Sequence, residues 1–391
     1  MNREKGARSA PEVKGVALLG STGSIGTSAL KVLGRHRDRF SVTALTARSN
    51  SSLLEEQVKQ FNPRYVGLVE ASAGSGKNGQ EKWCTGEKCL VEAATFGGAD
   101  IVINAIVGAA GLDATLAALD AGKRVALANK ETLVIAGELV EQARKRGNAD
   151  LVPVDSEHSA ILQCIAARPN SEVRRIILTA SGGPFREWDS EKLASASVSE
   201  TLRHPTWKMG KKVTVDSATL ANKALEVIEA HFLFGIPYDR IEVVVHPQSV
   251  VHSFVEFIDG SVLAQLGVPS MELPILYALT HPERLEDSGV PSFDPVALSP
   301  MTFEKVDESR FPALRLGIEA GKRGGAAPAV FNGANECAVA AFLADKIAFT
   351  DIHRGISSAL DAYGDNAGKT KEELLDADAS ARRHVTEMFK C

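Results

Sequence analysis

A glycine-rich run directly after an apolar stretch constrains the fold of this chain more than any other feature. The run GSTGSIG, residues 20–26, follows the apolar residues 16–19. Glycines at this spacing allow a tight turn, a close approach of backbone to phosphate oxygens, and close packing of the following helix. Because free N–H groups and the positive end of that helix attract a pyrophosphate, the run predicts a dinucleotide site. The spacing is GxxGxxG rather than GxGxxG, so a strand, turn and helix with glycines used only for packing is the alternative.

Apolar runs alternate with helical patterns over the first 150 residues. This βαβ repetition predicts a Rossmann-like, doubly wound parallel sheet. A stretch rich in Gly, Ser and Lys, residues 71–86, predicts an exposed loop. We expect strands at residues 16–19, 40–47, 65–69, 101–105, 124–128 and 151–154, and helices at 24–34, 51–61, 111–121 and 132–146.

The pattern changes after residue 156. We expect strands at 175–179, 242–245 and 250–258, and a turn at Asp259-Gly260 that returns the chain as a hairpin partner, 261–266. Such antiparallel strands could extend a sheet across a dimer interface. From Pro312 onward, apolar residues at helical spacing predict a small bundle. The α/β chain therefore divides into a flexible tail (1–14), a nucleotide-binding domain (15–150), a central α+β domain (151–285), a linker (286–311) and a helical domain (312–391).

Composition excludes several classes of protein. A chain of 391 residues is expected to form two or three domains, and 44% hydrophobic with 24% charged residues is typical of a soluble globular protein. The formal net charge is -5 and no basic block is present, which argues against a nucleic-acid partner. The apolar stretches are too short to cross a membrane, and the N-terminus lacks the apolar core of a secretory signal. The five cysteines fit neither zinc nor disulfide spacing, which favours a reducing, cytoplasmic location.

The end of the second predicted strand indicates which nucleotide is bound. An NAD-dependent enzyme places an acid there for the ribose hydroxyls. This chain has Ala47, Arg48, Ser49 and Asn50 instead. A guanidinium pairs well with phosphate, so the segment favours the extra phosphate of NADP. An ordinary exposed loop arginine is the alternative.

Acidic residues predict a metal site. Asp155 and Glu157 follow an apolar strand, and their spacing sends both side chains the same way from extended chain. Close carboxylates repel unless a cation lies between them, and oxygen ligands suit Mg²⁺ or Mn²⁺. Glu226 supplies a third acid. For the adjacent pair alone, a solvated surface position is the alternative.

A well-marked helix is expected over residues 215–235, with Asp216 or Ser217 as its N-cap. Ser217, Asn222 and Lys223 offer a hydroxyl, an amide and a cation, which together suit a phosphate group. Ordinary surface polar residues on an amphipathic helix are the alternative.

A loop with an aromatic side chain lies between these segments. Residues 203–212, RHPTWKMGKK, carry Trp207, which could close over a substrate and exclude water. A tryptophan packed at a domain junction is the alternative. His158, His204 and His252 are candidates for substrate contact or proton transfer, although a single histidine is more often structural.

A series of motifs, taken in chain order, resembles the 1-deoxy-D-xylulose 5-phosphate reductoisomerase family. The motifs are GSTGSIG, AIVGAAGL, ALANKE, VDSEHSAI, TASGGPF, HPTWKMG, VDSATLANKALEVIEA and HPQSVVHS. The resemblance covers nearly the whole chain, and the series is specific although no single motif is. It implies an N-terminal NADPH domain, a central catalytic and dimerisation domain with a flap at about 203–212, a helical C-terminal domain and a homodimer. The chain departs from the family at residues 48–50, where many members have glycine.

The resemblance also implies roles for individual residues. The metal, Mg²⁺, Mn²⁺ or Co²⁺, would be bound by Asp155, Glu157 and Glu226. Lys130, Glu157 and His204 would be catalytic, with Lys130 stabilising negative charge. The substrate would be held by Lys130, Ser156, Glu157, Ser181, His204, Trp207, Ser217, Asn222, Lys223 and Glu226. NADPH would be contacted by Thr22, Gly23, Ser24, Ile25, Asn129, Glu131 and Gly210, together with the segment Ala47, Arg48, Ser49 and Asn50.

The implied reaction has two steps. A C–C bond of 1-deoxy-D-xylulose 5-phosphate breaks and re-forms, and NADPH then reduces the aldehyde to 2-C-methyl-D-erythritol 4-phosphate, in the non-mevalonate route to isoprenoids. Glu157 and a metal-bound water are both candidates for the proton carrier. Another NADP oxidoreductase, such as a semialdehyde dehydrogenase, would need a cysteine nucleophile, and no cysteine lies in such a motif. A non-catalytic NADP-binding regulator would have no use for three convergent acids.

Overall fold

The computed structural model describes residues 12–70, 83–166, 168–207 and 209–391. Its first part is a seven-stranded sheet in the order β4-β3-β2-β1-β5-β6-β7, in which every neighbouring pair is parallel. The strands are β1 Lys14–Leu19, β2 Phe40–Ala47, β3 Tyr65–Leu68, β4 Cys84–Thr85, β5 Ile101–Asn104, β6 Arg124–Leu127 and β7 Leu151–Pro153. The predicted doubly wound sheet is confirmed. The order reverses between β1 and β5, where ligands bind in open α/β sheets.

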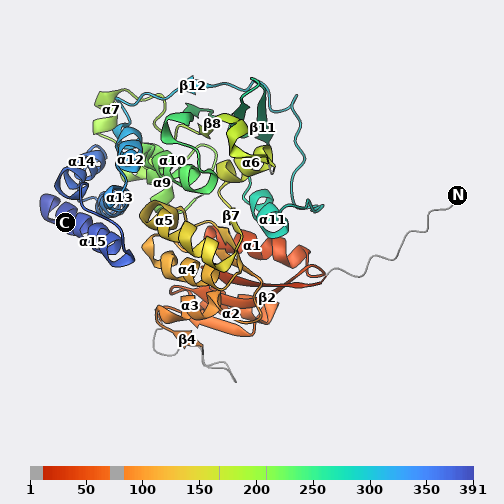
Figure 1. The fold of residues 1–391 in the computed structure, drawn as a ribbon. Helices are drawn as coiled ribbons and strands as arrows, with labels where there is room; N and C mark the ends of the chain where they lie inside the picture. Colours follow the sequence, from red (N-terminus) through yellow and green to blue (C-terminus); the bar gives the residue numbers. More distant parts are fainter. Residues whose placement is uncertain (1–11, 71–82, 167, 208) are drawn as a thin grey trace.

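Helices cover both faces of this sheet, because its strands are apolar on both sides. Ala17 and Leu19 of β1 face one core, while Val16 and Leu18 face the other. The first core is covered by α3 Lys88–Ala94, α4 Leu112–Asp120 and α5 Lys130–Gly147. The second core is covered by α1 Ser24–Arg35, α2 Ser51–Phe61 and α11 Glu272–Thr280. The apolar run that forms α11 was missed from the sequence, and it brings a distant segment onto the first sheet (Figure 1).

The second sheet has five strands in the order β11-β10-β8-β9-β12. They are β8 Val173–Ala180, β9 Ile241–Val245, β10 Val251–Phe257, β11 Val262–Leu266 and β12 Glu304–Lys305. The predicted hairpin between β10 and β11 is confirmed, with Gly260 at φ +85° in its turn. Helices α6 Ser156–Ile165 and α10 Ala221–Phe234 share a core with this sheet. Strand β12 pairs with β9, so the segment expected to be only a linker also supplies an edge strand.

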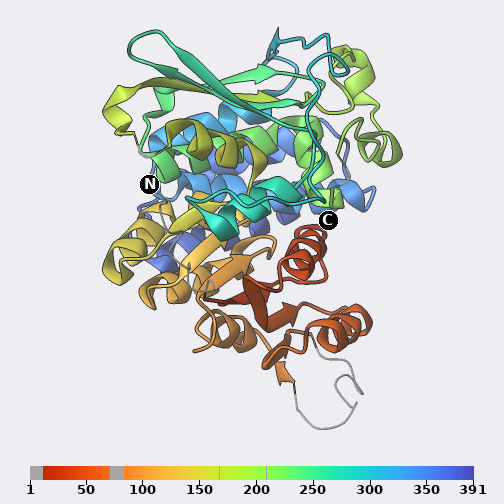
Figure 2. The same ribbon diagram turned by 90° about the vertical axis from the view of Figure 1, so that its right-hand side faces the viewer.

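The helical C-terminus is confirmed and consists of α12 Pro312–Arg323, α13 Ala327–Leu343, α14 Asp351–Tyr363 and α15 Lys371–Phe389. Helix α13 is the buried centre of this bundle, with Val330, Phe331 and Ala334 fully enclosed. At the start of α15, Thr370 and Glu373 form a capping box. The bundle lies beside both α5 and α10, so it contacts helices that belong to both of the other parts of the molecule (Figures 1 and 2).

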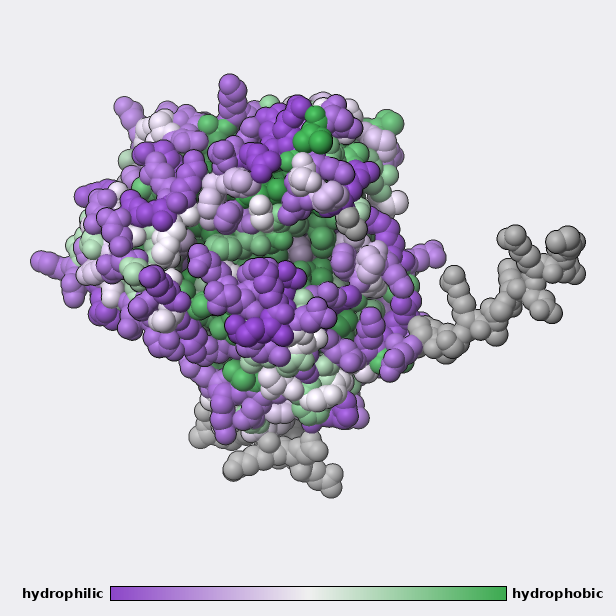
Figure 3. Space-filling view, in the orientation of Figure 1, coloured by the Kyte–Doolittle hydropathy of each residue, from purple (hydrophilic) through white to green (hydrophobic). Residues whose placement is uncertain are grey.

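The face shown in Figure 3 is mostly hydrophilic, with a band of hydrophobic residues across its middle, between the two sheets. No helix in the described part of the chain is long and apolar enough to cross a membrane. Predictions that fall on residues 1–11 and 71–82 lie outside the described residues.

Candidate active site

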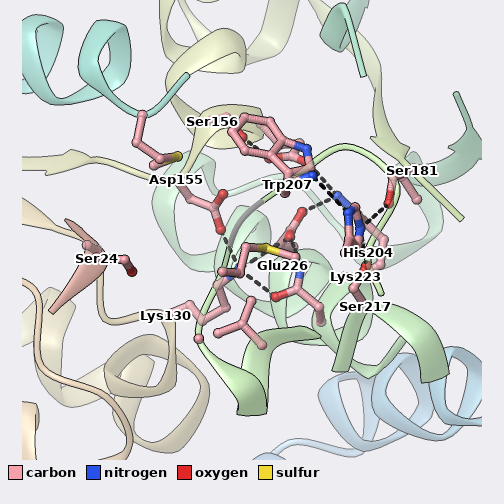
Figure 4. Close-up of a pocket in the computed structure, with 18 of the residues that line it drawn as sticks. Ser24, Lys130, Asp155, Ser156, Ser181, His204, Trp207, Ser217, Lys223 and Glu226 are labelled. Carbon is pink, nitrogen blue, oxygen red and sulfur yellow. Dashed lines mark hydrogen bonds and ion pairs between the residues drawn. The ribbon is translucent and has the colours of Figure 1, made fainter. Parts of the chain in front are cut away.

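A cavity lies where the carboxyl ends of the first sheet meet α6, α9 Lys211–Thr219 and α10 (Figure 4). It brings together predicted site residues from widely separated parts of the chain. The predicted residues that line it are Ser24, Ile25, Lys130, Asp155, Ser156, Glu157, Ser181, His204, Trp207, Gly210, Ser217, Asn222, Lys223 and Glu226. None of the cysteines in the described part of the chain lines it, so the structure offers no nucleophile for dehydrogenase chemistry of the semialdehyde type.

Three carboxylates converge on one side of the cavity. Asp155, Glu157 and Glu226 each offer an oxygen, and these oxygens all lie within 4.8 Å of one another. The local geometry differs from the prediction, because Glu157 does not lie on extended chain. Asp155 is the N-cap of α6 and Glu157 lies in its first turn, so the helix start aims both acids into the cavity. An all-oxygen set of this kind fits Mg²⁺ or Mn²⁺.

Two lysines hold the three acids together. The Lys130 ammonium lies 2.5 Å from Asp155 Oδ2 and 3.2 Å from Glu226 Oε1. The Lys223 ammonium lies 2.8 Å from Glu157 Oε1 and also contacts Glu226 Oε2. Burial alone would lower the pKa of both ammonium groups, but the surrounding carboxylates outweigh it and raise both pKa values. Both lysines therefore stay charged and compensate acids that would otherwise repel.

The acids do not share one protonation behaviour. Burial and, after it, the nearby charge of Glu157 raise the pKa of Glu226 to about 7, against the opposing effect of both lysines. Burial also opposes ionisation of Asp155, but its ion pair with Lys130 wins and lowers its pKa. At neutral pH, Glu226 is therefore the acid whose charge depends most on what else enters the cavity.

A second cluster of polar side chains surrounds His204. Its Nδ1 accepts the backbone N–H groups of Thr206 (3.1 Å) and Trp207 (2.9 Å). The ring proton must then be on Nε2, which lies 3.0 Å from Ser181 Oγ and 3.2 Å from Ser217 Oγ. Burial lowers the pKa of His204, which favours this neutral form. The two hydroxyls and the imidazole N–H thus form a group of donors facing the cavity.

The predicted helix over 215–235 is wrong as a single element. The structure has two helices, α9 and α10, separated by Leu220 at φ +60°, a left-handed conformation that is costly for leucine. The Thr219 side chain supports the break, because it donates to the Asp216 carbonyl at 3.2 Å and accepts the Ala221 N–H at 3.3 Å. Asp216 and Ser217 consequently lie inside α9 rather than at a cap, and the bend directs Ser217 and Asn222 into one cavity.

The glycine loop has the close contacts that its sequence predicts. Gly20 has φ +79°, and a Cβ placed there would lie 2.7 Å from the Ala105 carbonyl oxygen. A Cβ on Gly26 would lie 2.3 Å from the Gly20 carbonyl oxygen. Only glycine fits at either position, so α1 can begin directly behind the turn with Gly23 as its N-cap. Ser24 and Ile25, in the first turn, reach the cavity.

The other predicted nucleotide residues lie outside the cavity: Thr22, Gly23, Ala47, Arg48, Ser49, Asn50, Asn129 and Glu131. Arg48 is exposed at the end of β2 and pairs with Glu70 Oε1 at 2.7 Å. The Asn50 side chain caps α2 by accepting the Leu53 N–H at 3.2 Å. Asn129 donates to the carbonyls of Ile106 and Gly108, at 2.8 and 3.0 Å, and so fixes the loop after β5.

Met209 of the predicted flap lines the cavity, and so does Met271, which sequence reasoning missed and which only the apolar run of α11 behind it could have signalled. Two of the three candidate histidines lie outside the cavity. His158 is fully buried and does not line the cavity, and its Nε2 lies 2.9 Å from the Glu226 carbonyl oxygen. His252 is also buried outside it. His158 instead groups with Asp155 and Glu229, and the possible ligand atoms of these three residues all lie within 4.8 Å of one another, although only Asp155 among them lines the cavity.

The fold and this cavity define a dinucleotide-dependent oxidoreductase with a place for a divalent metal. Three family models match the chain: 1-deoxy-D-xylulose 5-phosphate reductoisomerase at residues 16–137, its C-terminal domain at 151–234, and the DXP reductoisomerase C-terminal domain at 266–384. The 1-deoxy-D-xylulose 5-phosphate reductoisomerase of Gloeobacter violaceus is 49% identical over 380 residues, which is 95% of this chain and 97% of that protein. That of Geobacter metallireducens is 50% identical over 382 residues, covering 96% of this chain and 99% of that protein.

Solved structures agree with the sequence comparisons. The reductoisomerase from Zymomonas mobilis in complex with NADPH matches with a TM-score of 0.89 and 44% identity, over 97% of this chain and 100% of that one. A DOX-P reductoisomerase in complex with NADPH, fosmidomycin and magnesium matches with a TM-score of 0.91 and 39% identity, over 97% and 98%. The chain therefore belongs to the 1-deoxy-D-xylulose 5-phosphate reductoisomerase family.

Proposed function

We propose that this chain catalyses the NADPH- and divalent-metal-dependent isomerisation and reduction of 1-deoxy-D-xylulose 5-phosphate to 2-C-methyl-D-erythritol 4-phosphate, in the non-mevalonate isoprenoid pathway. One observation carries the proposal. In a member of this family, three carboxylates and two lysines face the same cavity as the start of the glycine-loop helix. Relatives in the same family were solved with NADPH, fosmidomycin and magnesium.

The acid side of the cavity would hold the metal through Asp155, Glu157 and Glu226. When bound, the divalent ion would polarise the substrate carbonyl and orient its oxygens. Lys130 lies half-buried beside these acids and keeps its charge, so its ammonium is suited to stabilise negative charge that develops on the substrate. Ser156, next to Asp155, offers a hydroxyl to the same part of the substrate.

The part of the cavity around His204 would hold the phosphate. Ser181 and Ser217 supply hydroxyls there, and Asn222 and Lys223, which also contact Glu226, would add an amide donor and a cation from the border with the acid cluster. His204 donates through Nε2 in the same cluster, and the backbone of Trp207 fixes its orientation. Trp207 and Met209 line the cavity from the flap, where their apolar surfaces would keep water from the reacting carbons.

The nucleotide would lie across the carboxyl end of the first sheet. The start of α1, with Thr22, Gly23, Ser24 and Ile25, suits a pyrophosphate, because its N–H groups lack partners within the helix. Arg48 would take the extra phosphate of NADPH, with Ala47, Ser49 and Asn50 beside it, once its guanidinium leaves Glu70. The remaining predicted contacts are Asn129, Glu131 and Gly210.

We extend the proposal to assembly, location and domain division. Strand β11 ends the second sheet, and its Val262 and Leu263 are 50% and 40% exposed. An exposed apolar edge strand is suited to pairing with a second copy, which supports a homodimer. Five free cysteines suit the reducing cytoplasm. The division into parts at 15–150, 151–285, 286–311 and 312–391 belongs to the same proposal.

The test is an assay of NADPH oxidation with 1-deoxy-D-xylulose 5-phosphate and Mn²⁺. We expect turnover that EDTA abolishes, and loss of turnover in Glu226→Gln with NADPH binding retained. Glu242→Gln, at an exposed glutamate of β9, is the matched control and should keep full activity. Absence of NADPH oxidation by the wild-type protein would refute the function, and full activity of Glu226→Gln would refute the metal assignment.

A further inference from the structure

The first turn of α5 carries two successive charged residues that contact different parts of the molecule. Lys130 contacts the acids of the candidate metal site. Glu131 is buried, with 5% of its surface exposed, and its Oε1 lies 2.8 Å from the Lys212 ammonium. Lys212 is the second residue of α9, directly after the segment that carries Trp207 and Met209. One rigid helical turn therefore connects the end of β6 to both the acid cluster and the base of the flap.

Lys212 is held on its other side by the helical bundle. Its ammonium lies 2.9 Å from Asp216 Oδ2, and Asp216 Oδ1 accepts from Asn335 Nδ2 of α13 at 2.9 Å. Burial alone would lower the pKa of Lys212, but the charges of Asp216 and Glu131 outweigh it and raise the pKa. The Asp216 side chain is 1% exposed and that of Lys212 is 18% exposed, so this ion pair is largely shielded from solvent.

The same network reaches the loop after β5. Glu336 follows Asn335 on α13, and Arg382 of α15 donates to its Oε2 at 2.7 Å. Its carboxylate oxygens lie so close to Gly108 that a Cβ at that glycine would be 3.2 Å away. The bundle thus approaches the loop after β5 directly, in addition to its connection through Lys212.

The flap is anchored differently at its two ends. His204, at its beginning, is tied to Ser181 and Ser217. At its end, Gly210 is the N-cap of α9 without a side-chain cap, and a Cβ there would meet nothing within 4 Å. The Gly210 carbonyl accepts from the backbone N–H and the hydroxyl of Thr214, both at 3.0 Å, and the ion pairs of Lys212 are the charged interactions that hold this end.

We propose that Lys212 is a positioning residue for the flap, and that the helical C-terminal bundle acts on the reaction by holding Lys212 through Asn335 and Asp216. Lys212 lines no part of the cavity, so it acts through the placement of Met209 and Trp207. The kinetic part of this inference rests on the proposed function, whereas the structural part does not.

The structural test is hydrogen–deuterium exchange on the full-length protein without ligands. Lys212→Met removes the ion pairs with both Glu131 and Asp216, so we expect exchange of amides in residues 203–212 to rise at least about tenfold, which is the size of effect expected for one charge-assisted bond alone. Asn335→Ala keeps the ion pairs and should raise exchange in the same segment by a smaller factor. Lys212→Arg should restore the wild-type rate there. Arg146→Met removes a surface pair with Asp120 and is the control, with no expected change.

The kinetic test separates this role from a general loss of stability. Lys212→Met should raise the KM for 1-deoxy-D-xylulose 5-phosphate about tenfold, while Mn²⁺ affinity stays within about twofold of the wild type, because Lys130 and the acids are untouched. Unchanged exchange at 203–212, or an equal rise throughout the protein in both Lys212→Met and Asn335→Ala, would overturn the inference. An inactive wild-type protein would instead refute the proposed function and leave the exchange result standing.

Discussion

The raised pKa of Glu226 makes metal binding dependent on pH. Burial, followed by the charge of Glu157, raises this pKa to about 7, so the metal-free protein holds a proton here under mildly acidic conditions. A cation must displace that proton, because a carboxylate binds metal only when ionised. In the metal-free protein, the raised pKa of Glu226 adds to the free energy of unfolding at pH values below 4.5, the ordinary pKa of a glutamate. This contribution is lost as the pH rises through 7. Metal binding should follow the opposite trend and strengthen with rising pH.

The magnitude follows from one ionisation. With a pKa of about 7, the apparent dissociation constant for Mn²⁺ should be about twofold weaker at pH 7 than at pH 8, and about tenfold weaker at pH 6. Calorimetric titration in two buffers with different ionisation enthalpies measures the affinity and the protons released. We expect about one proton per ion at pH 6 and almost none at pH 8.

Two variants identify the proton's source. Glu226→Gln should bind Mn²⁺ weakly and release no proton at pH 6. Glu229, about one turn further along α10, also has its pKa raised to about 7 by burial, but it groups with Asp155 and His158 rather than with Glu157 and Glu226. Glu229→Gln should therefore keep the pH dependence. Mn²⁺ affinity that does not change between pH 6 and 8 in the wild-type protein would contradict this account of the site.

Two further predictions concern packing and nucleotide choice. Gly137→Ala should destabilise the protein by about 1–3 kcal/mol in urea unfolding, because its Cβ would lie 2.3 Å from the Phe232 ring, whereas Gly34→Ala, whose Cβ has ordinary contacts, should not. Arg48→Ala should raise the KM for NADPH but not for NADH, and Glu70→Gln should lower the KM for NADPH by a few-fold by freeing Arg48. Equal effects of Arg48→Ala on the KM for NADPH and for NADH would show that Arg48 does not bind the extra phosphate of NADPH.

The first sheet could be predicted because the sequence of each strand is enough to identify it as a strand. Strands such as β2 Phe40–Ala47 and helices such as α2 Ser51–Phe61 begin and end where the sequence places them. Continuous apolar runs mark strands buried on both faces, and the glycine loop fixes where the first helix starts. The convergence of Asp155 with Glu226 was expected from family resemblance, since no local pattern links residues so far apart.

Features that depend on distant contacts were not predictable. Nothing in the sequence around Leu220 marks a break, because Thr219 and the surrounding packing impose the left-handed conformation. Strand β12 is only two exposed, charged residues, Glu304 and Lys305, and becomes a strand by pairing with β9. Asp155 was assigned to extended chain because an N-cap is itself extended, and the helix that follows changes where Glu157 points.

The site has a common structural origin in the starts of three helices. Lys130 is the first residue of α5, Asp155 is the N-cap of α6, and Lys223 lies in the first turn of α10. A helix N-terminus favours negative charge, so the acids at the start of α6 are stabilised while both lysines are placed against the local dipole. Each lysine is nevertheless needed, since three ionised carboxylates alone would be strongly repulsive when buried. When all three acids are ionised, the cluster and its two lysines carry one net negative charge, and a divalent cation reverses that sign, so the metal also makes the cavity attractive to a phosphate.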